Sequence, residues 1–151
     1  MSKWKRSADI RETALRLLDL RAHSTLELSQ KLQNRGFPGE EISELLTSLA
    51  EQGLLDDEKY GIERLRTLRS RKKGRRKVEY DLISRGLKRD LVERILARFS
   101  LDDEEETARR LLQEKGFLHD DSKGRRFLEL RGFSYDAIGR VVRDQSIDMG
   151  P

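Results

Sequence analysis

A short motif that occurs three times in the chain constrains its fold more than any other feature. Each copy has a leucine, two variable residues, an arginine, a glycine and an apolar residue: Leu32-x-x-Arg35-Gly36-Phe37, Leu82-x-x-Arg85-Gly86-Leu87 and Leu128-x-x-Arg131-Gly132-Phe133. Apolar residues follow each glycine at matching offsets, and the glycines are 50 and 46 residues apart. Such a period is typical of stacked copies of one supersecondary unit that is too small to bury its own apolar face. The pattern therefore predicts a three-unit array rather than an enzyme built around one pocket.

The composition indicates that these units are helical. Charged residues make up 40% of the chain and apolar residues 35%, whereas about 25% charged residues is typical of a globular protein. Leu, Ala, Glu, Lys and Arg dominate, and the only prolines are Pro38 and Pro151, a bias that favours helix over strand. We therefore expect an all-α fold, an elongated array of three tandem three-helix repeats with about nine helices.

The repeats are expected at residues 8–55, 56–100 and 101–147. In the first repeat, Ser24 is followed three residues later by Glu27, a capping-box pattern that predicts the start of a helix. The motif glycine predicts the end of that helix, because glycine readily adopts the left-handed conformation of a terminating residue.

The arginine of each motif copy stands directly before the glycine, at Arg35, Arg85 and Arg131. A cation in the last turn of a helix complements the helix dipole and bonds to free carbonyl groups. We expect this structural role for all three, and a shared role in binding is the alternative.

No pattern typical of a catalytic, metal or cofactor site is present. The two histidines, His23 and His119, are far apart and lack ligand-like neighbours. Phosphate-binding loops, dinucleotide-binding glycine patterns and nucleophile elbows are absent. Carboxylate pairs such as Asp56 and Asp57 precede predicted helices, where capping explains them. We expect a protein that is not an enzyme and needs no cofactor.

The chain lacks the features of a secreted or membrane protein. It has no cysteine, which excludes disulfides, and no apolar run approaches the roughly 20 residues that span a bilayer. Its first residues are basic but lack the apolar segment of a secretory signal. We expect a cytoplasmic, monomeric protein with no membrane partner.

The strongest candidate binding feature is a run of basic residues in the middle repeat. Residues 56–100 carry 15 basic and 8 acidic side chains, and residues 64–77 have no acidic residue at all. The candidate binding residues, referred to below as the basic run, are Arg64, Arg66, Arg69, Arg71, Lys72, Lys73, Arg75, Arg76 and Lys77.

Mutual repulsion within the basic run predicts a partner that is a polyanion or an acidic protein face. The alternative is a solvated helix face that aids solubility. Only Tyr60 and Tyr80 lie near enough in sequence to stack on bases, and we expect both to be partly buried. Contact with a nucleic-acid backbone is therefore better supported than sequence-specific recognition.

Several segments together resemble the bacterial RecX family of regulatory proteins over about residues 10–145. They are Leu54-Leu55-Asp56-Asp57-Glu58-Lys59-Tyr60, the stretch from Arg69 to Arg76, Leu82-x-x-Arg85-Gly86 and Leu130-Arg131-Gly132-Phe133-Ser134. The resemblance implies tandem three-helix repeats and a non-enzymatic, cytoplasmic modulator of the RecA recombinase. Such a protein lies in the groove of the RecA–DNA filament and usually inhibits filament growth, ATPase, strand exchange and coprotease activity. The family's basic central region matches Arg71 to Lys77 here.

The chain departs from the family pattern at a few positions. Gly61 follows the tyrosine where alanine is common, and Arg75 follows Gly74 where proline is frequent. These departures leave the local geometry of residues 71–77 open.

A direct DNA-binding protein, such as a transcription regulator built from helix-turn-helix-like units, is the alternative function. Three-helix units with a basic face can bind DNA in this way, and the helix expected at 76–85 offers Arg76, Lys77, Glu79 and Tyr80. In either case the basic middle repeat is where single-stranded or duplex DNA would bind.

Overall fold

The computed structural model describes the backbone of residues 3–148 and the side chains of residues 9–142. Within this part of the chain the structure has helices and no strand, which confirms the predicted all-α class. The nine helices are α1 (Lys3–Leu20), α2 (Thr25–Asn34), α3 (Gly39–Glu51), α4 (Asp57–Ser70), α5 (Arg75–Ser84), α6 (Arg89–Leu96), α7 (Leu101–Lys115), α8 (Asp121–Leu130) and α9 (Tyr135–Asp148).

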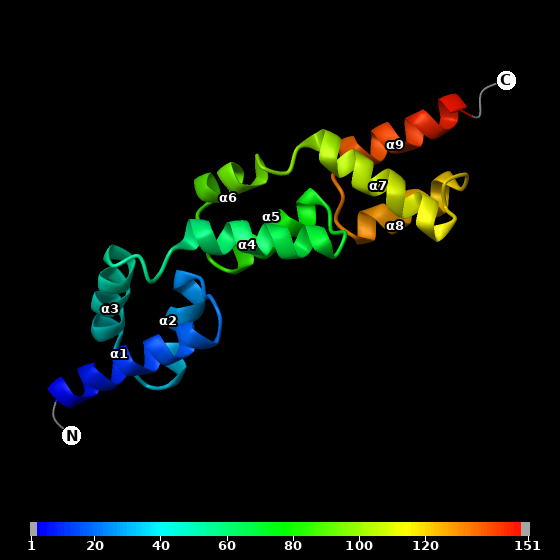
Figure 1. The fold of residues 1–151 in the computed structure, drawn as a ribbon. Helices are drawn as coiled ribbons and strands as arrows, with labels where there is room; N and C mark the ends of the chain where they lie inside the picture. The colour runs from blue at the N-terminus through cyan, green and yellow to red at the C-terminus, as the bar shows by residue number, and fades with distance from the viewer. Residues whose placement is uncertain (1–2, 149–151) are drawn as a thin grey trace.

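The helices form an elongated array of three tandem three-helix units, as predicted (Figure 1). Unit 1 consists of α1–α3, unit 2 of α4–α6 and unit 3 of α7–α9, and α1 and α9 lie at opposite ends of the molecule. Each unit has its own cluster of buried apolar side chains. The boundaries 8–55, 56–100 and 101–147 stay a prediction.

The repeated motif is the end of the middle helix in each unit. The amide of Phe37 donates to the carbonyl of Leu32 at 3.2 Å, and the amide of Gly36 donates to Gln33 at 2.9 Å. The same two hydrogen bonds recur in the second and third copies, and all three glycines have φ between 81° and 89°. This is the Schellman motif, in which the motif leucine and the residue after the glycine form an apolar contact. The spacing that the three motif copies share is thus a helix-termination signal.

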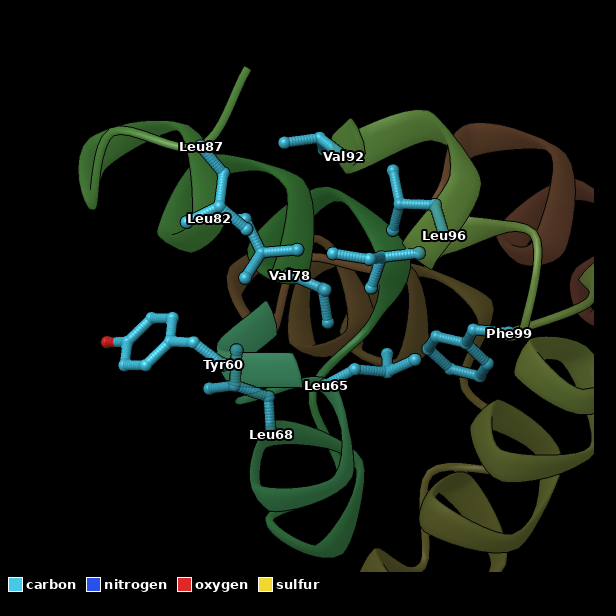
Figure 2. Packing of buried hydrophobic residues seen from close by; sticks show 10 residues of the cluster. Tyr60, Leu65, Leu68, Val78, Leu82, Leu87, Val92, Leu96 and Phe99 are labelled. Atoms are coloured by element: carbon cyan, nitrogen blue, oxygen red, sulfur yellow. The ribbon is translucent and has the colours of Figure 1, made fainter. Parts of the chain in front are cut away.

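The basic run lies on α4, on α5 and on the turn between them, and both helices contribute side chains to the apolar core of unit 2 (Figure 2). Leu65 and Leu68 of α4 and Val78 and Leu82 of α5 are all at most 5% exposed. Gly61 allows α4 to approach α6 closely, because a Cβ there would lie 2.3 Å from the Cδ1 atom of Ile95. The buried faces of α4 and α5 therefore set which side chains of the run face outward.

Units 1 and 2 meet at a joint made by the start of α2. The amide and the hydroxyl of Thr25 both donate to Asp57 Oδ1, at 2.8 and 3.0 Å. The hydroxyl of Ser24 donates to the carbonyl of Arg85 at 2.7 Å, while it accepts from the amide of Glu27 in the predicted capping box. The N-terminus of α2 is thus held by groups of the next unit.

Candidate interaction surface at the joint of units 2 and 3

The basic run covers the end of α4, the following turn and the first turn of α5. Arg64, Arg66 and Arg69 project from α4, Arg71 to Lys73 form the turn, and Arg75 to Lys77 begin α5. The basic run is therefore not one continuous helix. It is interrupted by the turn before Gly74, where the chain meets unit 3.

The three arginines of α4 have acidic partners, although residues 64–77 themselves contain no acidic residue, so the mutual repulsion expected within the basic run is relieved at these positions. Arg64 makes a bidentate pair with Asp81 of α5, at 2.8 and 3.0 Å. Arg66 pairs with Glu63 at 2.6 Å. These carboxylates lie before or after the acid-free stretch in sequence, and the fold brings them to it.

Arg69 is held from two sides. Its guanidinium lies 4.5 Å from the ring centroid of Phe99 and 3.7 Å from the carboxylate of Asp103. A cation over an aromatic face is stabilised by the ring quadrupole. Arg69 therefore belongs mainly to the packing between units 2 and 3.

The turn presents its cations in an unusual backbone conformation. Lys72 has φ 59°, and it is the only residue other than glycine with positive φ in the described part of the chain. The amide of Lys73 donates to Leu68 at 3.0 Å and that of Lys72 donates to Arg69 at 2.9 Å. Lys72 thus occupies the place that glycine has in the repeated motif, with a side chain that is exposed.

The first turn of α5 is docked on unit 3 through its backbone. The amides of Gly74 and Arg76 donate to the carbonyls of Arg131 and Gly132, at 3.1 and 2.9 Å. A Cβ on Gly74 would lie 2.3 Å from the Cα atom of Phe133. Glycine is required there because the two backbones touch, and this docking defines the geometry of residues 71–77 that the sequence left open.

A buried carboxylate completes this joint. Glu104 of α7 is 0% exposed. It accepts hydrogen bonds from the amide of Arg75 at 2.9 Å and from the amide and hydroxyl of Ser134, at 2.8 and 2.6 Å. The donors satisfy the buried charge, and the bonds connect the starts of α5 and α9.

Six cations of the run have no carboxylate within 4.0 Å among the described side chains. They are Arg71, Lys72, Lys73, Arg75, Arg76 and Lys77. Of these, Lys73 and Arg75 are half-buried and the others are exposed. The candidate surface therefore consists of the turn after α4 and the outer face of the first turn of α5.

The two tyrosines near the run differ in exposure. Tyr60 is 5% exposed, and its hydroxyl points away from the core cluster of unit 2 (Figure 2). Tyr80 is 73% exposed, so the expectation that it is partly buried is wrong. It lies one turn after Arg76 on α5, a spacing that predicts a shared helix face.

The motif arginines have three different environments. The guanidinium of Arg85 donates to Asp81 at 3.0 Å, Glu27 at 3.3 Å and Tyr60 at 2.7 Å, and so connects units 1 and 2. Arg131 donates to the carbonyl of Arg71 at 3.2 Å, while Arg35 is exposed. The bridging role of Arg85 has no local sequence signal, because its partners come from three helices.

Glu27 is the most perturbed acid at the first joint. Burial alone would raise its pKa, but hydrogen bonds from Tyr60, Arg21 and the amide of Ser24 outweigh burial and hold the pKa at about 2. The side chain is only 16% exposed. Glu27 is therefore a structural anion whose partners keep it charged.

The remaining candidates for chemistry have structural surroundings. His23 is 3% exposed, with Nδ1 2.9 Å from the carbonyl of Arg21 and Nε2 2.8 Å from Nζ of Lys31. Nowhere among the described residues do three or more His, Asp or Glu side chains group as metal ligands would. A helix with the length and apolarity to cross a bilayer is likewise missing from that part of the chain.

Comparison with known proteins identifies relatives over most of the chain. The family model for the first three-helix domain of RecX matches residues 11–49. The regulatory protein RecX of Ectopseudomonas mendocina is 38% identical, over 89% of this chain and 93% of the relative. The regulatory protein RecX of Chlorobium limicola is 33% identical, over 85% of this chain and 84% of the relative.

Solved structures have the same fold. The crystal structure of RecX from Lactobacillus salivarius superposes with a TM-score of 0.86 at 22% identity, covering 95% of this chain and 98% of that one. A second crystal structure, of a regulatory protein RecX, gives 0.80 at 21% identity, covering 92% of this chain and 72% of that one.

Proposed function

The chain belongs to the RecX family of regulatory proteins, and we propose that it binds the RecA recombinase filament and inhibits its ATPase, strand-exchange and coprotease activities. The protein acts in the cytoplasm, in recombination and DNA repair, as a binding protein without catalysis. The observation that carries the proposal is family membership over nearly the whole chain, at 38% identity across 93% of a regulatory relative.

The shape and charge of the molecule support this proposal. An array of three units in a line (Figure 1) suits a partner with an extended groove better than a compact one. The cations of the basic run that have no carboxylate partner, among them Arg71, Lys72 and Lys77, lie in the middle unit. A filament on DNA offers phosphates and acidic side chains that would neutralise them.

A helix-turn-helix regulator of duplex DNA is less well supported. Such proteins place the N-terminal residues of a recognition helix in the major groove. In α5 the amides of Gly74, Arg75 and Arg76 are bonded to unit 3, so the backbone of this helix end is docked on protein, although the side chains of Arg76 and Lys77 are exposed.

The test is binding to RecA filaments that are assembled on single-stranded DNA with a non-hydrolysable nucleotide. The test variant is Arg71→Ala with Lys72→Gly and Lys77→Ala, which removes three exposed cations. The matched control is Lys123→Ala with Arg125→Ala and Arg126→Ala, which removes three exposed cations from α8. We expect wild type and control to sediment with the filament and the test variant to bind at least about tenfold more weakly. Failure of the wild type to sediment would contradict the proposal. Equal binding by the wild type, the test variant and the control would show that the basic run does not contribute to filament binding.

A further inference from the structure

Two exposed tyrosines lie near cationic side chains at the joint of units 2 and 3. Tyr80 of α5 is 73% exposed and Tyr135 of α9 is 64% exposed. The guanidinium carbon of Arg76 lies 4.6 Å from the ring centroid of Tyr135. We call Arg76, Tyr80 and Tyr135 the tyrosine surface.

The fold of the joint places these side chains together. Arg76 and Tyr80 are four residues apart on α5, so they are neighbours on one face, opposite the buried Val78 and Leu82. Ser134, the residue before Tyr135, shares Glu104 with the amide of Arg75. Arg76 is therefore a helix-face neighbour of Tyr80 and lies over the ring of Tyr135.

Exposed cations and a surface hollow that contains one carboxylate, Asp136, surround the tyrosine surface. Arg71, Lys72 and Lys77 are exposed, and among the described side chains no carboxylate lies within 4.0 Å of their cationic groups. Tyr135 also borders a surface hollow with Leu101, Asp136, Gly139 and Arg140. There is thus open space next to Tyr135.

This combination fits one chemical class of ligand. Proteins that bind single-stranded nucleic acid combine a cationic track for the phosphates with aromatic rings on which bases stack, and arginine planes add to the stack. The carboxylates of an acidic protein face would neutralise the cations but would not stack on the two exposed rings. In a duplex the base faces are already occupied by stacking with their neighbours.

We propose that the tyrosine surface binds single-stranded nucleic acid, with bases stacked on Tyr80 and Tyr135 and phosphates at Arg71, Lys72 and Lys77. Stacking accepts any base, so binding is independent of sequence. The inference does not rest on the proposed function, because the chain alone forms the surface.

The test uses fluorescence anisotropy with the full chain and two labelled oligonucleotides of equal length, an oligothymidylate and its abasic counterpart. We expect the wild type to bind the oligothymidylate roughly tenfold more tightly than the abasic strand. Tyr80→Ala with Tyr135→Ala should bind both strands equally, at the abasic level. Tyr80→Phe with Tyr135→Phe should keep the preference, because stacking needs the ring and not the hydroxyl.

Two controls separate stacking from charge and from general loss of apolar surface. Arg71→Ala with Lys72→Gly and Lys77→Ala should weaken binding to both strands and reduce the salt dependence. Leu20→Ala, at an 80% exposed residue of unit 1, should change neither. Equal binding of the wild type to both strands, no binding, or an unchanged preference in the double alanine variant would overturn the proposal. So would tighter binding to duplex DNA or to polyglutamate than to the oligothymidylate.

Discussion

Ser24 and Gly74 are equivalent residues at the two joints between units. Each precedes the motif glycine of its own unit by the same number of residues, and each donates to the carbonyl of the motif arginine in the next unit. The hydroxyl of Ser24 donates to Arg85 at 2.7 Å, and the amide of Gly74 donates to Arg131 at 3.1 Å.

The equivalence extends to the next residue, although the acid that it meets differs. The amides of Thr25 and Arg75 both donate to a carboxylate of the following unit, Asp57 and Glu104. The arginine–glycine turns of the second and third motifs are therefore both a helix end within their own unit and the docking point for the preceding unit. This explains why an array rather than three separate bundles is formed.

Gly74→Ala should destabilise the second joint. The backbone of Gly74 is compatible with alanine, at φ −86°, but the new Cβ would lie 2.3 Å from the Cα of Phe133. We expect a loss of about 1–3 kcal/mol in the free energy of unfolding, measured by urea denaturation. Gly39→Ala is the matched control, because nothing lies within 4 Å of its Cβ, and it should be neutral or stabilising. An equally stable Gly74→Ala protein would contradict the close approach.

Glu104→Gln should weaken the same joint electrostatically. The carboxylate is buried and accepts three hydrogen bonds, whereas an amide offers one oxygen and places an NH2 group against donors. The expected loss is about 1–3 kcal/mol. Glu106→Gln, which removes only an exposed pair with Arg110, should change the stability by less than about 0.5 kcal/mol. Equal effects of the two substitutions would show that Glu104 is not a structural anion.

Stability should depend on Glu27 at acid pH. Its pKa is about 2 in the folded chain and 4.5 ordinarily, so the folded state favours the carboxylate. The contribution is present above about pH 4.5 and is lost as pH falls toward 2, with a maximum of about 3 kcal/mol. Denaturation of wild type and Glu27→Gln at several pH values should give a difference that shrinks across this window. A difference that is independent of pH would contradict the assignment.

Lys72→Gly should stabilise the protein while removing a cation. Lys72 has φ 59°, which costs a residue with a side chain about 1–2 kcal/mol; the added freedom of glycine in the unfolded chain offsets part of the gain. We expect a net increase of up to about 1 kcal/mol in the free energy of unfolding. Lys73→Gly is the control, because the φ of Lys73 is not positive, and it should be destabilising. If Lys72→Gly destabilised the protein as much as Lys73→Gly, the positive φ of Lys72 would be contradicted.

The sequence predicted those features that depend on local chemistry. The three helix ends and the capping box at Ser24 follow from patterns within one or two turns. The repeat period then predicted the array. Tyr80 was placed wrongly although its spacing from Arg76 and from the buried Leu82 indicates the outer face.

The ion pairs of the basic run could not be predicted in this way. Asp81 reaches Arg64 from α5, and Asp103 reaches Arg69 from α7, so each depends on how helices cross. The same holds for Arg85, whose partners come from α2, α4 and α5. Local rules define the units, while packing between helices and units decides which cations remain without a partner.

The most direct test of the central claim is the rate of ATP hydrolysis by RecA on single-stranded DNA as this protein is added. We predict that the wild type and the Lys123→Ala, Arg125→Ala, Arg126→Ala control lower the rate, and that the Arg71→Ala, Lys72→Gly, Lys77→Ala variant requires a much higher concentration for the same effect. An ATPase rate that is unchanged by the wild-type protein would contradict the account.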